Sequence, residues 1–302
     1  MALEIQVTAK GLMPKPLTEA ELCPRGLQCG HWNHAGVLDE GPDPDGRVLC
    51  DPARLGRGLY LQAAPGEKRQ VRLRQTLPCT PDDIGLLCRM VKLLCERWKT
   101  DRFTADGETV RLSELDGWRE KWCREGLNLL HDAAGRWEGE DLRMLTAARF
   151  PIYLEPDAVA KLREAKDLDF FTKYLQQKQA RDVYYAKPSF YQRADGAALG
   201  VYTLTERTDS IFPLAPFVPP LYSLTLENFR LRDEQVNEWQ VSLVRVWEEN
   251  GQMQGRALGT VPFDVFARRA SLEARPRFDQ RHVLLRADDL DALLREGADG
   301  PL

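Results

Sequence analysis

The side chains best suited to binding a metal lie near the start of the chain, at Cys23, Cys29, His31 and His34. Two thiolates and two imidazoles can bind Zn²⁺ in a tetrahedron, and the metal would order a loop that shows little secondary-structure pattern. Five residues separate the two cysteines, whereas zinc ribbons favour roughly two to four. The favoured interpretation is an ordinary loop with free thiols, and a zinc-ordered N-terminal module is the alternative.

A second group of residues is suited to binding an anion. Arg54 and Arg57 surround Gly56 and Gly58. Glycine lets the backbone approach an anion, and arginine can bind a phosphate through two parallel hydrogen bonds. The third glycine of a dinucleotide-binding fingerprint is absent, so a strand entry or bulge is favoured. The alternative is a binding site for a phosphate-bearing ligand such as a nucleotide, with the anchors Arg54, Arg57, Lys187 and Arg193.

Aromatic and arginine side chains suited to a protein interface occur in the second half of the chain. A hairpin with an Asn250-Gly251 turn would place Arg245 directly opposite Arg256. Like charges across a strand pair are unfavourable, so we expect a bulge, splaying of both side chains into water, or an acidic partner between them. The candidate interface residues are Tyr184, Tyr185, Trp239, Arg245, Trp247 and Arg256.

The remaining reactive side chains do not gather into a catalytic set. Cys88 and Cys95 fall on the apolar face of a helix, which predicts core packing. The adjacent carboxylates Asp82 and Asp83 open the same helix, so capping explains them. The sequence predicts no catalytic residue and no cofactor other than the zinc considered above, and an enzyme is the less favoured interpretation.

Helices and antiparallel hairpins mix along the chain without a regular β-α-β rhythm, which predicts an α+β fold. Thr80 and Pro81 mark a helix start, and a tight turn at Asp106-Gly107 would pair Thr104 with Thr109. The predicted helices cover residues 81–98, 113–132, 156 onward, 167–181, 263–270 and 288–296. The predicted strands cover residues 3–8, 48–50, 59–62, 70–75, 103–110, 189–193, 199–205, 239–248, 252–261 and 282–286.

These elements predict two regions of similar length. Residues 1–150 form an N-terminal α+β region with a long irregular loop at 9–53, which contains a turn at 43–46. Residues 151–302 form a C-terminal α+β region with two long hairpins and a proline-rich connector at 213–220. In the first of these hairpins, an Asp195-Gly196 turn would place the Tyr191 ring opposite Gly200.

Composition limits the partners and the compartment. The chain of 302 residues has a formal net charge of −4, which argues against a dedicated nucleic-acid binder despite the alternation of aromatic and cationic residues at 170–193. Glu4 interrupts the N-terminal apolar run, and no stretch approaches the roughly 20 apolar residues of a membrane helix. Seven cysteines at scattered spacings predict free thiols and a cytoplasmic protein.

Two segments carry a family resemblance. The segment Leu175–Pro213, with Gln176-Gln-Lys-Gln-Ala-Arg-Asp-Val-Tyr-Tyr-Ala-Lys-Pro-Ser-Phe-Tyr191, and the segment Asp51-Pro-Ala-Arg-Leu-Gly-Arg-Gly58 are similar to an uncharacterised bacterial family catalogued as a domain of unknown function. The resemblance covers most of the chain. It implies a bacterial cytoplasmic origin, and it implies no activity and no catalytic residue.

Together these patterns favour a non-enzymatic protein of the bacterial cytoplasm that binds another protein, such as an immunity-type or accessory factor. The alternative is an enzyme or binder of a phosphate-bearing ligand, and a zinc-ordered module is a further one.

Overall fold

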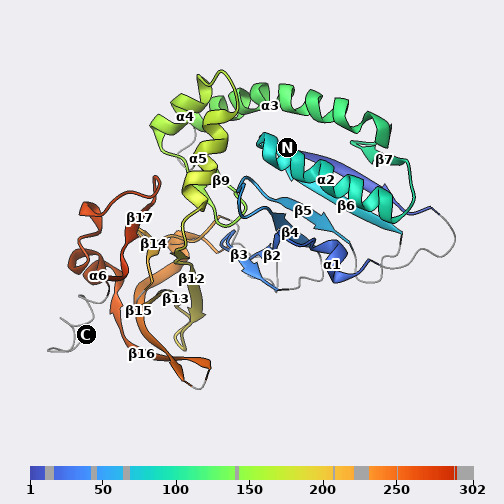
Figure 1. Ribbon diagram of the computed structural model, residues 1–302. Coiled ribbons are helices and arrows are strands. Elements are labelled where there is room, and N and C mark those ends of the chain that lie inside the picture. The colour runs from blue at the N-terminus through green and yellow to red at the C-terminus, as the bar shows by residue number, and fades with distance from the viewer. Residues whose placement is uncertain are drawn as a thin grey trace. The chain divides into compact units, whose positions relative to one another are not determined.

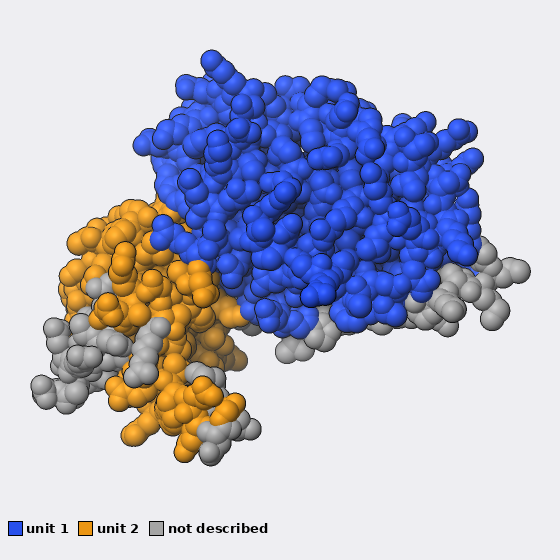
Figure 2. Space-filling view, in the orientation of Figure 1, with its two compact units in different colours: residues 1–181 blue, residues 182–302 orange. Residues whose placement is uncertain are grey.

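A computed structural model describes residues 1–10, 17–41, 46–63, 69–139, 143–206, 208–220, 231–249, 251–288 and 290. The chain forms two compact units, Met1–Arg181 and Asp182–Leu302 (Figure 2). Both units combine helices with mainly antiparallel strands (Figure 1), which confirms the α+β prediction. No helix among the described residues is long and apolar enough to cross a membrane.

Unit 1 is organised around a sheet of eight described strands in the order β3-β2-β4-β5-β6-β1-β7-β8, and every described pair is antiparallel. The strands are β1 Ala2–Thr8, β2 Gln28–Trp32, β3 Leu38–Glu40, β4 Arg47–Cys50, β5 Leu59–Gln62, β6 Gln70–Thr76, β7 Arg102–Ala105 and β8 Glu108–Arg111. In β1 and β6 buried aliphatic residues alternate with exposed polar ones. Period-two patterning therefore gives the sheet one apolar and one polar face.

Helix α2, Pro81–Arg97, covers the apolar face of this sheet (Figure 1). Its start agrees with the prediction, because Thr80 caps the helix, Pro81 occupies the first turn and Asp83 completes a capping box. The buried side of α2 packs into one core with the inward residues of the strands. Among the described residues this helix core packs on one side of the sheet, and the polar side chains of β1 and β6 on the other side are exposed or half-buried.

Two further helices and a short strand pair follow α3, Leu115–Glu138. They are β9 Met144–Leu145, β10 Ile152–Tyr153, α4 Pro156–Arg163 and α5 Asp169–Gln179. The helix predicted at 113–132 does not begin at residue 113. Instead, Arg111 N–H donates to the Glu114 carboxylate at 2.9 Å, and a short 3₁₀ turn, Leu112–Glu114, precedes the helix.

The predicted irregular loop at 9–53 is wrong for much of its length. It contains the short helix α1, Glu19–Leu22, and strands β2, β3 and β4. Gly30 in β2 approaches the neighbouring strand so closely that a Cβ would lie 2.3 Å from the Asp39 carbonyl oxygen. Because β2 contains this glycine and several polar residues, it lacks the alternation of apolar and polar residues by which a strand is predicted from sequence. The predicted turn at 43–46 lies mostly outside the described residues.

Unit 2 contains two small sheets and a short helix, α6 Phe263–Arg269. The first sheet joins β12 Pro188–Gln192, β13 Ala198–Thr205, β15 Val236–Glu249 and β16 Gln252–Pro262. The second joins β11 Tyr184–Tyr185, β14 Ser210–Pro213 and β17 His282–Leu285. Two 3₁₀ turns, Asp233–Gln235 and Leu272–Ala274, complete the described elements, and most of the helix predicted at 288–296 lies outside them.

The two units divide later in the chain than the boundary that we expected at residue 150. Helices α4 and α5 share a core with α3 that includes Leu130, Leu162 and Phe171. A division at 150 would cut through this core, whereas the observed division at Arg181/Asp182 follows it.

The two hairpins of unit 2 test the predicted strand registers. Arg245 lies opposite Arg256 as predicted, with a bulge near Leu243. In the other hairpin the register differs by one residue, since Phe190 rather than Tyr191 lies opposite Gly200. Gly200 is instead covered by Trp239 of the parallel neighbour β15, because a Cβ at Gly200 would lie 2.4 Å from that indole ring.

This close approach predicts the effect of adding one methyl group. Gly200→Ala should lower the free energy of unfolding by about 1–3 kcal/mol, because the new Cβ forces the Trp239 ring out of its packing against Tyr202. Urea unfolding monitored by tryptophan fluorescence measures the change. Gly255→Ala on β16 is the matched control, since its Cβ would meet only ordinary contacts from 3.5 Å. Equal stability of the two variants would contradict the packing role assigned to Gly200.

Candidate functional site

The first predicted anchor region, the loop 51–58, is held by the buried carboxylate of Asp83. The two oxygens of Asp83 accept hydrogen bonds from the Arg57 backbone N–H at 2.9 and 3.1 Å. Asp83 also accepts from the backbone N–H and the hydroxyl of Thr80, both at 2.9 Å. Burial raises the pKa of the Asp83 carboxyl, and the hydrogen bonds from Thr80 and Arg57 oppose this effect.

The Arg57 side chain lies inside unit 1 and is 4% exposed. It donates one hydrogen bond to the Pro78 carbonyl at 2.8 Å and another to the Thr146 hydroxyl at 2.8 Å. Burial lowers the pKa of this guanidinium to about 10. Arg57 therefore joins three segments of unit 1, and it is not an accessible anion anchor.

The other predicted anchors do not join Arg57. The exposed side chain of Arg54 lies 3.4 Å from the carboxylate of Asp82. Lys187 and Arg193 belong to unit 2, where Arg193 forms an ion pair with Glu238 at 2.6 Å. Unit 1 contains Arg54 and Arg57 and unit 2 contains Lys187 and Arg193, so neither unit contains all four predicted anchors.

The cysteines of the predicted zinc site form a disulfide between Cys23 and Cys29, with Cα atoms 6.1 Å apart. The expectation of free thiols is wrong for this pair, and the sulfurs cannot bind zinc as thiolates in this form. His31 lies in β2 and is half-buried. Within the described residues, no group of three or more His, Cys, Asp or Glu side chains could hold a metal ion. Zinc binding by the reduced chain stays a prediction.

The other five cysteines are free, and four of them are buried. Burial raises the pKa of the Cys50 thiol to about 12 and that of Cys88 and Cys95 to about 11. A raised pKa keeps the thiol protonated and therefore a poor nucleophile at neutral pH. Cys88 and Cys95 pack in the core of unit 1, as predicted from their spacing.

The predicted interface residues have different environments in unit 2. Tyr185 is buried, while Tyr184 and Trp239 are half-buried. The other three, Arg245, Trp247 and Arg256, are exposed on the outer part of the hairpin β15–β16. Arg245 forms an ion pair with Glu206 at 3.1 Å. Glu206 follows β13, which pairs with β15 on the edge away from β16, so this carboxylate does not lie between the two opposed arginines.

Tyr185 belongs to a buried polar network that sequence reasoning missed. Its hydroxyl lies 3.1 Å from Nε2 of His282, and Nδ1 of His282 lies 2.9 Å from the Asp279 carboxylate. The backbone N–H groups of Arg281 and His282 donate to the same carboxylate oxygen at 2.8 Å. Asp279 and His282 are 0% and 1% exposed, respectively. These hydrogen bonds connect β11 to β17 within the interior of unit 2.

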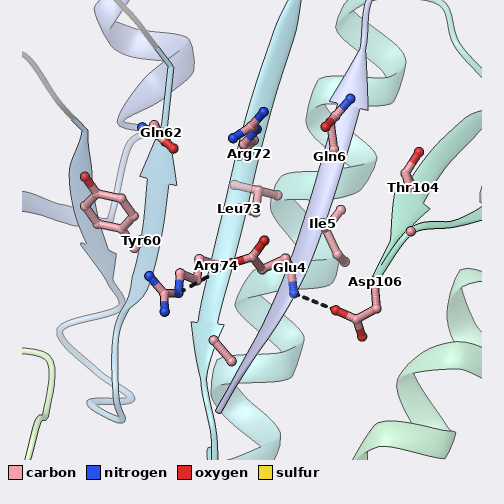
Figure 3. Close-up of a pocket in the computed structure, with 12 residues that line it drawn as sticks. Glu4, Ile5, Gln6, Tyr60, Gln62, Arg72, Leu73, Arg74, Thr104 and Asp106 are labelled. Carbon is pink, nitrogen blue, oxygen red and sulfur yellow. Dashed lines mark hydrogen bonds and ion pairs between the residues drawn. The ribbon is translucent and has the colours of Figure 1, made fainter.

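A shallow cavity of about 530 Å³ lies on the sheet of unit 1 and was also missed from the sequence. It occupies the polar face, opposite α2, and crosses strands β5, β6, β1 and β7 (Figure 3). Its lining consists mainly of alternate residues from these strands, with Ile5 and Leu73 between them and with Asp106 and Gly107 of the β7–β8 turn. The polar side chains that line it are Glu4, Gln6, Tyr60, Gln62, Arg72, Arg74, Thr104 and Asp106.

Strand register arranges these side chains in two rows. The first row crosses the strands as Gln62, Arg72, Gln6 and Thr104, and the second as Tyr60, Arg74 and Glu4. Figure 3 shows both rows on the same side of the sheet. In the second row Arg74 lies 3.7 Å from Glu4, whose backbone N–H donates to Asp106 at 3.0 Å. The second row and the adjacent Asp106 thus hold one cation and two carboxylates, and the first row carries one cation among neutral hydrogen-bonding groups.

The hydrogen bonds of Asp83 predict that it contributes much more to the free energy of unfolding than its neighbour Asp82 does. Asp83→Asn should lower the free energy of unfolding by about 2–4 kcal/mol, because it removes a buried acceptor of several hydrogen bonds. Asp82→Asn is the control, since Asp82 pairs with an exposed arginine and should cost less than about 1 kcal/mol. Chemical denaturation of both variants measures the difference, and comparable losses would refute a special role for Asp83.

The disulfide predicts the number of thiols that can be alkylated. Iodoacetamide in denaturant should modify five cysteines without a reductant and all seven after reduction. Mass spectrometry counts the adducts, and peptide mapping should assign the two additional ones to Cys23 and Cys29. Seven adducts without a reductant, in protein kept oxidised throughout purification, would show that the pair is not bonded.

The comparisons with known proteins agree with the family resemblance noted in the sequence. A family model described as "Domain of unknown function (DUF4299)" matches residues 43–294, which include parts of both units. No curated protein and no solved structure matches the chain. The matched region contains both the loop 51–58 with its buried arginine and the hairpins of unit 2. The chain belongs to the DUF4299 family.

Proposed function

We propose that this protein is a non-enzymatic binding protein of the bacterial cytoplasm that recognises another protein, as an immunity-type or accessory factor does. The observation that carries the proposal is the outer part of the hairpin β15–β16. There an exposed tryptophan, Trp247, lies beside the opposed arginines Arg245 and Arg256.

The hairpin extends beyond the sheet that supports it. Strand β13 pairs with β15 only as far as Val244, and from Arg245 onward the described residues of β15 pair with β16 alone. Side chains two residues apart on a strand share a face, so Arg245 and Trp247 follow Leu243 on the side that faces the core of unit 2. Past the end of that core the same side is open to solvent.

The residue types on this surface support recognition of a protein. Tryptophan and arginine are the residues most enriched among those that dominate binding energy at protein interfaces. Trp247 is 39% exposed, although a large apolar ring gains by burial. Glu206 orients Arg245 through their ion pair, so part of the surface is ordered before a partner arrives.

The compartment is proposed from the cysteines and from the family resemblance. Five cysteines are free, and free thiols are usual in proteins of the reducing cytoplasm. The Cys23–Cys29 bond closes a short segment of unit 1 and involves none of these thiols. A toxin gene beside the gene for this protein would support the immunity role.

The proposal predicts that Trp247→Ala abolishes partner capture. The full chain serves as bait in the native host, and proteins enriched by the wild type are quantified against those enriched by the variant. Loss of an anchor of this kind should weaken binding by about 2 kcal/mol or more, about thirtyfold. The matched control is Tyr191→Ala, since Tyr191 is 56% exposed and pairs with Leu199 on the opposite face of the same sheet. Identical enrichment with Trp247→Ala would refute the hairpin as the recognition surface.

A further inference from the structure

Arg72 on the polar face of unit 1 has an unused guanidinium. Within the described part of the chain its side chain makes no hydrogen bond and no ion pair, and it is exposed. The carboxylate nearest in register, Glu4, lies opposite Arg74 and interacts with that arginine instead. Arg72 therefore offers all five N–H donors to a ligand.

The neighbours of Arg72 in its row are uncharged hydrogen-bonding groups. Gln62 lies opposite it on β5 and Gln6 lies opposite it on β1, with Thr104 one strand further (Figure 3). Adjacent strands are about 4.8 Å apart, so the carboxamides of Gln62 and Gln6 can reach a small group bound to Arg72 from either side, while Thr104 lies one strand spacing beyond Gln6. Two carboxamides and one hydroxyl add further donors on both sides of the guanidinium. The row is thus rich in donors and suited to a ligand rich in acceptor oxygens.

We propose that this row is a binding site for the phosphate group of a small organic phosphate, with Arg72 as its anchor. Arg74 lies two residues away on the same face of β6, and its contact with Glu4 is long at 3.7 Å. Arg74 can therefore turn toward the same ligand at little cost, since exposed ion pairs contribute about 1 kcal/mol or less. Two arginines and several neutral donors match the three terminal oxygens of a phosphate monoester better than the two of a carboxylate.

The size and charge of the protein favour a small molecule over a polyanion. The cavity volume of about 530 Å³ lies within the range of about 300–1,000 Å³ that is usual for small-molecule sites. The net charge of −4 opposes the approach of a nucleic acid, whose binding depends on many cations. The ring of Tyr60 lines the same cavity and offers a flat surface to the organic part of the ligand.

Isothermal titration calorimetry of the full chain with AMP tests the site. AMP should bind the wild type, and Arg72→Gln should weaken binding about tenfold or more, because a charge-assisted bidentate contact is lost. Arg72→Lys should retain part of the affinity, since it keeps the charge and loses the planar fork. Arg89→Gln is the matched control. Arg89 is an exposed arginine on α2, which covers the other face of the sheet, and its variant should bind as the wild type does.

Three ligands without an organic phosphate complete the experiment. Inorganic phosphate should bind more weakly than AMP, and adenosine and succinate should not bind at matched concentration. Absence of AMP binding at millimolar concentration would overturn the inference. Equal binding of adenosine or succinate would overturn the assignment to phosphate, and an equal loss in Arg89→Gln would overturn the assignment to Arg72. Unchanged melting temperatures of the variants ensure that each loss reports binding.

Discussion

Unit 1 depends on one buried carboxylate, that of Asp83. It holds the loop 51–58 by accepting a hydrogen bond from the Arg57 backbone N–H. It also accepts one from the Thr80 backbone N–H, which completes the cap of α2. The loop backbone lies so close that a Cβ at Gly56 would be 2.4 Å from the carboxylate oxygens. The carbonyl of Gly56 also accepts from Gln179 at 2.8 Å, which ties α5 to the same point. A charge buried this deeply is tolerated only when several donors satisfy it, so these segments must assemble together.

Fixing α2 at this point decides which surface of the large sheet is available for binding. The helix buries the aliphatic residues of β1 and β6 on one face. The polar residues that alternate with them point to the other face of the sheet. There the hydrogen bonds between strands hold these polar side chains in rows. Unit 2 differs, since its exposed Trp247 lies on the part of the β15–β16 hairpin that extends beyond β13. The two proposed binding surfaces thus rest on different supports.

Local signals in the sequence predicted much of the fold. The alternation in residues 3–8 and 70–75, the cap at Thr80 and the turn at Asp106-Gly107 all correspond to elements of the structure. Contacts between distant segments could not be predicted in this way. The row around Arg72 exists only because β1 lies between β6 and β7, which brings Gln6 beside Arg72, 66 residues later in the chain, and beside Thr104, 98 residues later. The burial of Arg57 likewise depends on Asp83 and Thr146, and nothing near Arg57 in the sequence indicates it.

The outer half of the β15–β16 hairpin has unpaired strand edges that favour aggregation, and its charged residues oppose this tendency. A ribbon paired with no third strand exposes backbone donors and acceptors along its edge, and such an edge can template strand addition by other copies of the chain. Along this ribbon the side chains of Arg245, Glu248, Glu249 and Arg256 are exposed. Charges on an open edge disfavour the stacking of like ribbons, because each added copy would bring the same charges together. The protein can therefore keep an open ribbon in its native state and still resist aggregation.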